Sequence, residues 1–211
     1  MNKFIKALKN NINYLLIIVI VVLLFKVIEI FFFQEIQIFD NRIINLFQQH
    51  ILNDNLTDVM KYITLFGDKV CLTIIILSLI LLLKNKKYSL YMLINVLWAV
   101  LINKVVKYSF KRARPFEKLI AETGYSFPSG HAMCSIAFYG LFIYFIIKTK
   151  MKNVYKYLFS FCFSLLVIII GISRIYLNVH YFSDVVGGFI LGVLSLTFII
   201  NMIEDYEGGN L

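Results

Sequence analysis

Long apolar runs alternate with short polar segments along this chain of 211 residues. The apolar runs cover Tyr14–Phe33, Val70–Leu83, Tyr88–Val106, His131–Ile147, Tyr157–Ser173 and Tyr181–Ile203. Most of them approach the length of about 20 residues that an α-helix needs to cross a bilayer. The pattern therefore predicts six transmembrane helices.

The segment between the first two runs, Gln34–Phe66, is more polar but keeps a helical period. Its apolar residues recur on one side of a helix, at Ile36, Phe39, Ile43, Leu46 and Phe47. This period predicts an amphipathic segment that lies at the membrane interface or caps the bundle. His50 stands here beside two glutamines, and we interpret it as a surface histidine.

The pattern of apolar and polar residues also predicts the fold class. The apolar runs lack the period-two alternation of a membrane β-barrel, and a backbone facing lipid must form its hydrogen bonds within its own segment. The chain has no long polar linker at which a second domain would begin. We therefore predict an all-α integral membrane bundle with a single domain over residues 1–211.

Composition and charge agree with a membrane protein. Hydrophobic residues make up 60% of the chain and the mean hydropathy is +0.81, whereas a soluble domain is close to half apolar. The formal net charge is +9, but most basic residues lie in short segments between apolar runs, where they act as signals of topology. We therefore predict membrane lipids as partners and no nucleic acid.

Several residues within the runs have structural interpretations. Cys71, Cys134 and Cys162 lie inside or beside apolar runs, and free cysteine packs there as a small apolar side chain. Their odd number and their spacing predict neither a disulfide framework nor a zinc site, and we expect no cofactor. Lys26 and Glu29 are three residues apart in the first run, and we expect them to neutralise each other.

Six spans place both termini on one side of the membrane. The basic residues on that side are the N-terminal lysines and the turns Lys84–Lys87 and Lys148–Lys156. An equal number lies on the other side, concentrated around the loop Lys107–Gly130, and we attribute this concentration to function. Without that loop, the positive-inside rule places both termini in the cytoplasm and the loop on the extracytoplasmic face of the cell membrane. The first run is too long for a signal peptide, so we expect it to remain as a span.

Three polar clusters fall on this same face. They are Lys107–Pro115 after the third run, Phe127–His131 before the fourth, and Ser173–Asp184 between the fifth and the sixth. Their convergence from different spans predicts one site in the region 107–184.

The clusters contain groups that bind phosphate. Arg114 and Arg174 offer planar donor forks, and Lys107 adds a point charge. Ser129 and Gly130 precede a predicted helix, whose first backbone N–H groups attract anions. We therefore predict that these five residues form a phosphate-binding pocket without a metal ion.

Two histidines supply reactive groups. His180 and Asp184 are four residues apart and share a face if a helix begins near His180. A carboxylate on one ring nitrogen fixes the tautomer and leaves the other nitrogen as a nucleophile. His131 comes from a different span and is placed to protonate a leaving oxygen.

Each cluster taken alone has a simpler interpretation. Lys107 could be a membrane anchor, Pro128–His131 a helix cap, and the pair His180 and Asp184 a structural hydrogen bond. All three clusters on one face favour a catalytic site instead.

The spacing of these residues resembles the signature of a known family. Lys107-x6-Arg114-Pro115, Pro128-Ser-Gly-His131 and Ser173-Arg-x5-His180-x3-Asp184 are similar to the motifs of the type 2 phosphatidic acid phosphatase superfamily, without a departure.

The resemblance implies a role for each residue. His180 would attack phosphorus to form a phosphohistidine, Asp184 would orient it, and His131 would protonate the leaving group. The phosphate oxygens would be held by Lys107, Arg114, Ser129, Gly130 and Arg174.

We therefore predict metal-independent hydrolysis of a membrane lipid mono- or diphosphate. Undecaprenyl diphosphate, phosphatidylglycerol phosphate and phosphatidic acid are the candidate substrates. Three alternatives remain open: a phosphotransferase with the same site, a non-catalytic protein that binds anionic lipid, and a phosphatase of water-soluble esters.

Overall fold

The computed structural model describes residues 3–82 and 86–208, and these form helices and connecting loops without a strand. The helices are α1 (Lys3–Asn10), α2 (Ile12–His50), α3 (Asp54–Leu65), α4 (Lys69–Leu82), α5 (Lys87–Phe110), α6 (Gly130–Ser135), α7 (Leu141–Lys148), α8 (Asn153–Tyr176) and α9 (Phe182–Glu207). A π-helical turn, η1 (Ile136–Gly140), joins α6 to α7 without a break. The all-α prediction is confirmed.

Five helical segments are long and apolar enough to cross a membrane: α2, α5, Gly130–Lys148, α8 and α9. The chain is therefore a multi-pass membrane protein. α4 has 14 residues, about 21 Å at 1.5 Å per residue, which is shorter than the hydrocarbon core of a bilayer. It forms a sixth span only if α3 and α4, which meet at 50°, are counted as one broken span. Six spans thus remain a prediction, and the first two residues of the predicted turn Lys84–Lys87 lie outside the described residues.

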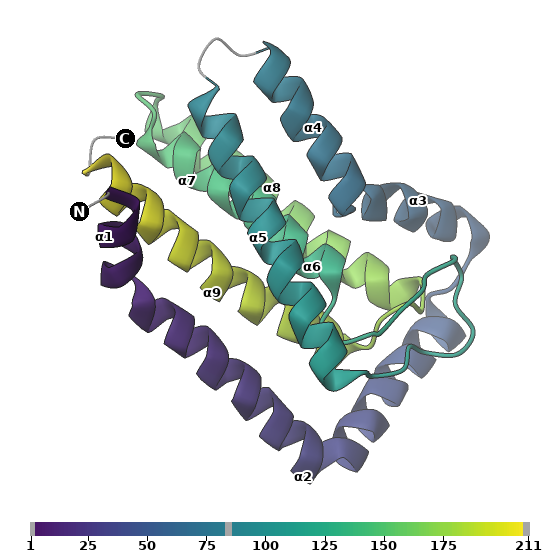
Figure 1. Cartoon of the computed structure of the whole chain (residues 1–211). Helices are drawn as coiled ribbons and strands as arrows, with labels where there is room; N and C mark the ends of the chain where they lie inside the picture. Colours follow the sequence, from purple (N-terminus) through teal and green to yellow (C-terminus); the bar gives the residue numbers. More distant parts are fainter. Residues whose placement is uncertain (1–2, 83–85, 209–211) are drawn as a thin grey trace.

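α2 is bent into two arms at Phe32, whose φ and ψ are −123° and 25°. The first arm is apolar and contains the predicted Lys26–Glu29 ion pair, at 2.5 Å. Figure 1 shows the second arm turning across the end of the bundle.

The second arm of α2 shows only part of the predicted amphipathic pattern. Ile43 and Phe47 pack inward, but Phe39 and Leu46 are about half exposed. The buried positions on this arm are Ile44 and Asp40, and Asp40 can be buried because a partner for its carboxylate comes from another part of the chain. His50, at the end of the arm, is exposed as predicted.

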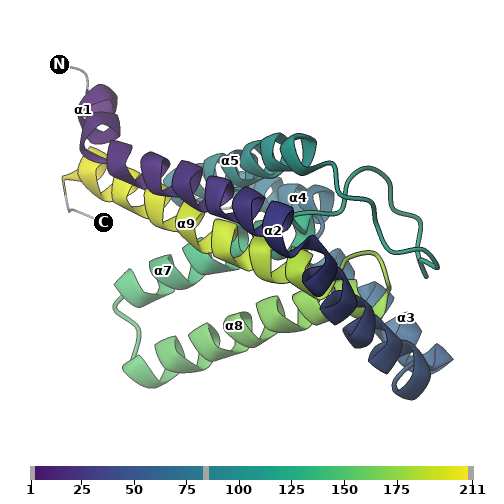
Figure 2. The ribbon, with the colours of Figure 1, turned by 90° about the horizontal axis from the view of Figure 1, so that it is seen from below.

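The two ends of the bundle are different in kind (Figures 1 and 2). α1 lies beside the end of α9, where Asn10 and Asn11 donate hydrogen bonds to Asp205 at 3.2 and 2.8 Å. The loop 111–129, the α3–α4 junction and the α8–α9 junction lie at the opposite end. All three predicted polar clusters are therefore remote from α1 and the end of α9.

α5 continues to Phe110, four residues beyond the predicted end of the third span. It stops because Lys111 adopts a left-handed conformation (φ 50°) and returns its N–H to the carbonyl of Lys107 at 2.9 Å. Lys107 consequently lies on the last helical turn and not in the loop, so its position is fixed by the helix.

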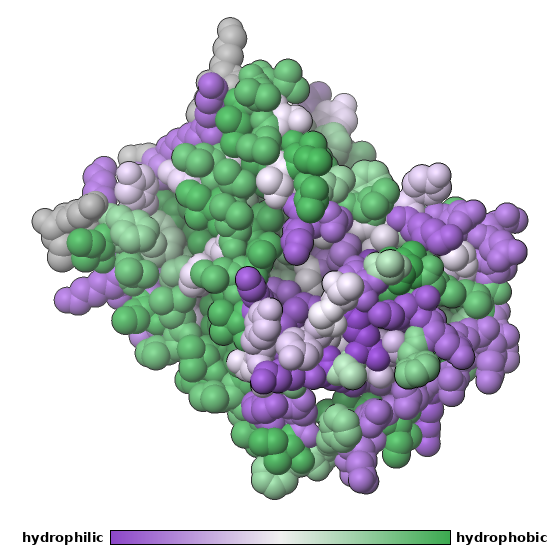
Figure 3. Space-filling view, turned by 45° about the vertical axis from the view of Figure 1, so that its right-hand side comes forward, coloured by the Kyte–Doolittle hydropathy of each residue, from purple (hydrophilic) through white to green (hydrophobic). Residues whose placement is uncertain are grey.

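The polarity of the surface also differs between the two ends of the bundle. Figure 3 shows apolar side chains over much of the visible face and polar ones gathered around a hollow toward the end that carries the loop 111–129. Large side chains such as Leu81, Val154 and Tyr157 are more than two thirds exposed, as expected for helices that face lipid.

Glycine allows α9 to approach α6 closely. A Cβ at Gly188 would lie 2.7 Å from the carbonyl oxygen of Ser129 and 3.0 Å from the Cβ of Ala132. Only glycine permits this approach without a shift of the backbone. The contact brings the segment that contains His131 next to the helix that carries Asp184.

Candidate active site

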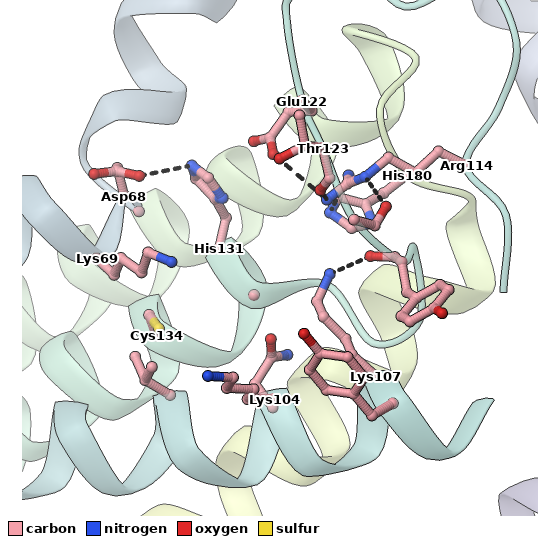
Figure 4. Close-up of a pocket in the computed structure, with 17 residues that line it drawn as sticks. Asp68, Lys69, Lys104, Lys107, Arg114, Glu122, Thr123, His131, Cys134 and His180 are labelled. Carbon is pink, nitrogen blue, oxygen red and sulfur yellow. Dashed lines mark hydrogen bonds and ion pairs between the residues drawn. The ribbon is translucent and has the colours of Figure 1, made fainter. Parts of the chain in front are cut away.

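The predicted clusters meet at a cavity of about 500 Å³ at the loop end of the bundle. Its walls come from the α3–α4 junction, α5, the loop 111–129, α6 and the α8–α9 junction (Figure 4). The predicted residues that line it are Lys107, Arg114, Gly130, His131 and His180. The other three predicted residues, Ser129, Arg174 and Asp184, are fully buried behind this lining.

His180 presents one ring nitrogen to Arg114 and the other to Asp184. Its Nε2 lies 3.0 Å from a guanidinium nitrogen of Arg114, and its Nδ1 lies 3.4 Å from Oδ2 of Asp184. A guanidinium only donates hydrogen bonds, so Nε2 carries a lone pair and the proton of the neutral ring is on Nδ1. In the free protein this lone pair accepts the hydrogen bond from Arg114, and both residues line the cavity.

Electrostatics keep this ring neutral. Burial lowers the pKa of His180 well below its ordinary value, and the charges of Arg114, Arg174 and Lys107 lower it further. Because the protonated form is disfavoured, the lone pair on Nε2 persists below neutral pH.

Asp184 is held by a set of donors, but not through the predicted arrangement. α9 begins at Phe182, after His180, so the two residues do not share a helical face. Asp184 instead folds back as the third residue of the helix and accepts the N–H of Tyr181 at 2.9 Å. The hydroxyl of Ser126 donates to the same oxygen. This capping geometry fixes the carboxylate beside His180.

Arg112 is a buried neighbour of Asp184 that the sequence did not single out. It donates to Oδ1 of Asp184 at 2.8 Å and to Asp40 at 2.7 Å. Asp40, on the second arm of α2, also accepts the backbone N–H of Ser183 at 2.9 Å and its hydroxyl at 2.5 Å. Arg112 was detectable as part of the basic run that contains Arg114, but Asp40 carries no signal in the sequence.

Two arginines of the predicted phosphate pocket are bridged by a carboxylate. Glu122, in the loop, forms an ion pair with Arg114 at 3.4 Å and a shorter one with Arg174. Arg174 also donates to the hydroxyl of Thr64 at 2.7 Å. An acidic side chain therefore occupies the position between two guanidinium groups where a phosphate would be expected.

The segment before α6 differs from the prediction at Ser129. Its backbone N–H donates to the carbonyl of Asp184 at 2.9 Å and is not directed to the cavity. Its hydroxyl oxygen accepts the N–H of Ala132 at 3.4 Å, which leaves the hydroxyl proton free to donate. Gly130 and His131 begin the helical segment, and no hydrogen bond from their backbone N–H groups to another described residue is found. A phosphate-binding role for Ser129 thus depends on its hydroxyl.

His131 lines the cavity from the start of α6, opposite His180 (Figure 4). Its Nε2 faces Oδ2 of Asp68 at 3.8 Å, a distance at which a protonated ring would form an ion pair. Asp68 begins α4 by accepting the backbone N–H of Val70 at 2.8 Å. We did not single out Asp68 from the sequence, where it is a lone acid before an apolar run.

The chemical groups of the cavity suit an anion. Among residues 3–82 and 86–208, no group of three His, Cys, Asp or Glu side chains is placed to hold a metal ion. Lys107 reaches toward the cavity and donates to the carbonyl of Tyr125 at 2.5 Å. The arrangement offers several cations, a neutral imidazole and a second histidine, which are the groups that phosphoryl transfer to nitrogen requires.

Comparison with known proteins shows which family the sequence matches. The sequence profile of the PAP2 superfamily matches residues 72–207. Phosphatidylglycerophosphatase B of Bacillus subtilis strain 168 is 38% identical over 107 residues, which are 50% of this chain and 52% of that protein. An undecaprenyl-diphosphatase of Sulfolobus acidocaldarius is 24% identical over 144 residues, 65% of this chain and 66% of that protein. The matches thus span between half and two thirds of these relatives.

A solved structure extends the likeness to nearly the whole chain. The crystal structure of a transmembrane PAP2-type phosphatidylglycerolphosphate phosphatase from Bacillus subtilis superposes with a TM-score of 0.77 and 30% sequence identity. The superposition covers 92% of this chain and 96% of that one.

Proposed function

Because the chain belongs to the PAP2 superfamily, we propose that it hydrolyses a phosphate monoester or diphosphate of a membrane lipid without a metal ion. The observation that carries this proposal is the state of His180. His180 lines the cavity with an unprotonated Nε2, while Asp184 lies on the side of Nδ1. A neutral histidine oriented in this way is a nucleophile for phosphorus.

The reaction proceeds in two steps. Nε2 of His180 attacks phosphorus, the bond from phosphorus to the leaving oxygen breaks, and His131 gives its proton to that oxygen. Water then attacks the phosphohistidine, His131 takes a proton from the water, and the bond from phosphorus to nitrogen breaks. Phosphate leaves, and both histidines return to their starting states.

Cations stabilise the charge on the transferred group. Lys107, Arg114 and Arg174 lie around the position that Glu122 occupies, so a bound phosphate replaces one carboxylate as the anion that they share. Arg114 then donates to a phosphate oxygen and no longer to Nε2, which frees the nucleophile. The backbone of Gly130 and the hydroxyl of Ser129 add neutral donors.

The location of the cavity supports a lipid substrate. It is lined by the α3–α4 junction and α5, at the end of helices that are apolar enough to span a membrane, so a tail can stay in the bilayer while the phosphate enters. Undecaprenyl diphosphate, phosphatidylglycerol phosphate and phosphatidic acid are the candidates. With the termini in the cytoplasm, the reaction takes place on the extracytoplasmic face.

Phosphate release by the purified protein in detergent tests this proposal. The three lipids and a water-soluble ester are offered separately in the presence of EDTA, with His180→Ala as the control. We expect release from at least one lipid, its loss in His180→Ala, and an acid-labile, base-stable phosphoryl adduct on the wild-type protein after rapid quenching.

Other results would point elsewhere. Equal rates with the soluble ester would contradict a preference for lipids, and transfer of the phosphoryl group to an added alcohol in place of water would favour a phosphotransferase. Binding without release would favour a protein that only holds anionic lipid. Inhibition by EDTA that added metal reverses would overturn the metal-free mechanism.

A further inference from the structure

Two lysines of the cavity are not used by the mechanism above. Lys69 begins α4, and Lys104 lies on α5 almost one turn before Lys107. Both line the same cavity as the two histidines. The side chain of Lys107 is hydrogen bonded to the loop, whereas the ammonium groups of Lys69 and Lys104 form no hydrogen bond or ion pair with any residue in the described ranges.

The acids of the cavity are already engaged elsewhere. Oδ1 of Asp68 accepts the backbone N–H groups of Val70 and Cys71 at 2.8 and 3.2 Å, and its Oδ2 faces His131. Glu122 is bound to the two arginines. The ammonium groups of Lys69 and Lys104 are therefore two uncompensated positive charges at the wall of a cavity.

Their place in the helices does not account for them. Lysine at a span end commonly anchors a helix at the interface, but an anchor need not line a cavity, as the exposed residues Lys69 and Lys104 both do. Lys69 is also the first residue of α4, where the helix dipole disfavours a positive charge. A ligand with negative charge explains both features.

The two lysines lie on the leaving-group side of the site. Figure 4 shows Arg114, Glu122 and His180 to the right of His131, Lys69 to its lower left, and Lys104 below it along α5. In an in-line reaction, phosphorus lies between the nucleophile and the leaving oxygen. Whatever follows the leaving oxygen in the substrate therefore extends past His131 toward the lysines.

We infer that Lys69 and Lys104 form a second anion subsite, which holds a second phosphate group of the substrate. This inference rests on the proposed function. The substrate class is a lipid with two phosphates, either adjacent, as in a lipid diphosphate, or separated by a glycerol, as in phosphatidylglycerol phosphate. Phosphatidic acid has a single phosphate, and its leaving group offers these lysines no charge to hold.

Selectivity among three lipids with the same dioleoyl chains tests the inference. Initial rates give kcat/KM for diacylglycerol diphosphate, phosphatidylglycerol phosphate and phosphatidic acid, with wild type, Lys69→Gln and Lys104→Gln. We expect the ratio of a two-phosphate lipid to phosphatidic acid to fall about 10- to 100-fold in each variant, the range for a lost hydrogen bond to a charged group. A ratio corrects for partial misfolding, because both rates come from the same preparation.

Lys61→Gln is the matched control. Lys61 lies on α3 at the same end of the bundle and pairs only with exposed Asp58, so the variant removes an equal charge outside the cavity. Its ratios should equal those of wild type.

The outcomes separate the possible substrates. If only the kcat/KM ratio for the diphosphate falls, the second phosphate lies next to the first. If only the ratio for phosphatidylglycerol phosphate falls, it lies one glycerol away. Ratios that stay at the wild-type value in both lysine variants would overturn the subsite. Absence of phosphate release from all three lipids by wild type would instead overturn the proposed function.

Inhibition by soluble anions measures the subsite without turnover. Methylenediphosphonate has two phosphonate groups and methylphosphonate has one. Wild type should bind the first more tightly, and Lys69→Gln should reduce that advantage about tenfold or more. Equal inhibition constants for the two anions in wild type would count against the inference.

Discussion

Arg114 and Glu122 set the state of His180 before a substrate arrives. Arg114 donates to Nε2 of His180, the proposed nucleophile, and is itself paired with Glu122. Both contacts must be exchanged when a phosphate binds, because the phosphate needs the guanidinium and the reaction needs the lone pair. The free site thus holds its own anion and its own hydrogen bond in place of the substrate.

The low pKa of His180 predicts an acid-side limit of activity. The unprotonated ring is the reactive form, and its folded-state pKa is well below the ordinary value near 6.5. Protonation should therefore reduce kcat/KM only well below pH 6.5. The measurement is a pH profile of kcat/KM, corrected for the second ionisation of the phosphate substrate near pH 6. If the corrected kcat/KM still falls on the acid side around pH 6.5, the result would contradict a neutral, buried ring.

Glu122 should compete with phosphate. Glu122→Gln removes the negative charge between Arg114 and Arg174, so inorganic phosphate should inhibit at about tenfold lower concentration, the size of one hydrogen bond to a charged group. Inhibition constants from steady-state kinetics measure this. Glu117→Gln, which changes an exposed acid of the same loop, should leave the constant unchanged, and an equal or higher constant in Glu122→Gln would place phosphate elsewhere.

At the scale of elements, the second arm of α2 is tied to the active site. Asp40 on this arm is fully buried and contacts Arg112 and Ser183, which both contact or neighbour Asp184. Two ion pairs that share Arg112 therefore join the arm, the loop 111–129 and the start of α9. The bend at Phe32 is what brings the arm across to this position.

Asp40→Asn should affect both stability and turnover. Removing one partner from a buried ion pair costs about 3–5 kcal/mol, so the unfolding temperature in detergent should fall by several degrees. We also expect kcat to fall about tenfold with little change in KM, because Arg112 would lose its orientation toward Asp184.

Glu35→Gln provides the control for this prediction. It removes an exposed carboxylate from the same arm and should change neither quantity. A lower unfolding temperature with an unchanged kcat in Asp40→Asn would show that the ion pair only holds the fold.

At the scale of the whole molecule, the bundle separates its two ends by function. Large apolar side chains cover the helices, and the charged cavity is confined to the end with the loop 111–129. α1, the end of α9 and the α7–α8 turn are at the other end (Figure 1). Under the proposed function, a lipid phosphate therefore binds from the side of the membrane that this end of the bundle faces.

Labelling with a membrane-impermeant maleimide tests this orientation. In a variant without the native cysteines, Phe116→Cys in the exposed loop should react in intact cells. Lys150→Cys in the α7–α8 turn should react only after the membrane is opened, because the proposed topology places this turn in the cytoplasm. The reverse pattern would place the active site in the cytoplasm.

The sequence by itself determined the features that depend on neighbouring residues. Apolar runs such as Tyr157–Ser173 became helices because burial in lipid forces a backbone to bond within its own segment. His131, His180 and Asp184 could be recognised in the sequence because each lies in a polar segment within a few residues of the start of a helix.

Only the tertiary structure decided the contacts between distant segments. Asp40 meets Arg112, Glu122 meets Arg174, and the N–H of Ser129 is bound to the carbonyl of Asp184. No periodicity relates residues that lie 50 or more positions apart, so their pairing depends on how the helices pack. Packing also brought Lys69 and Lys104 to one cavity, because the angle between α3 and α4 and the position of α5 are properties of the assembled bundle.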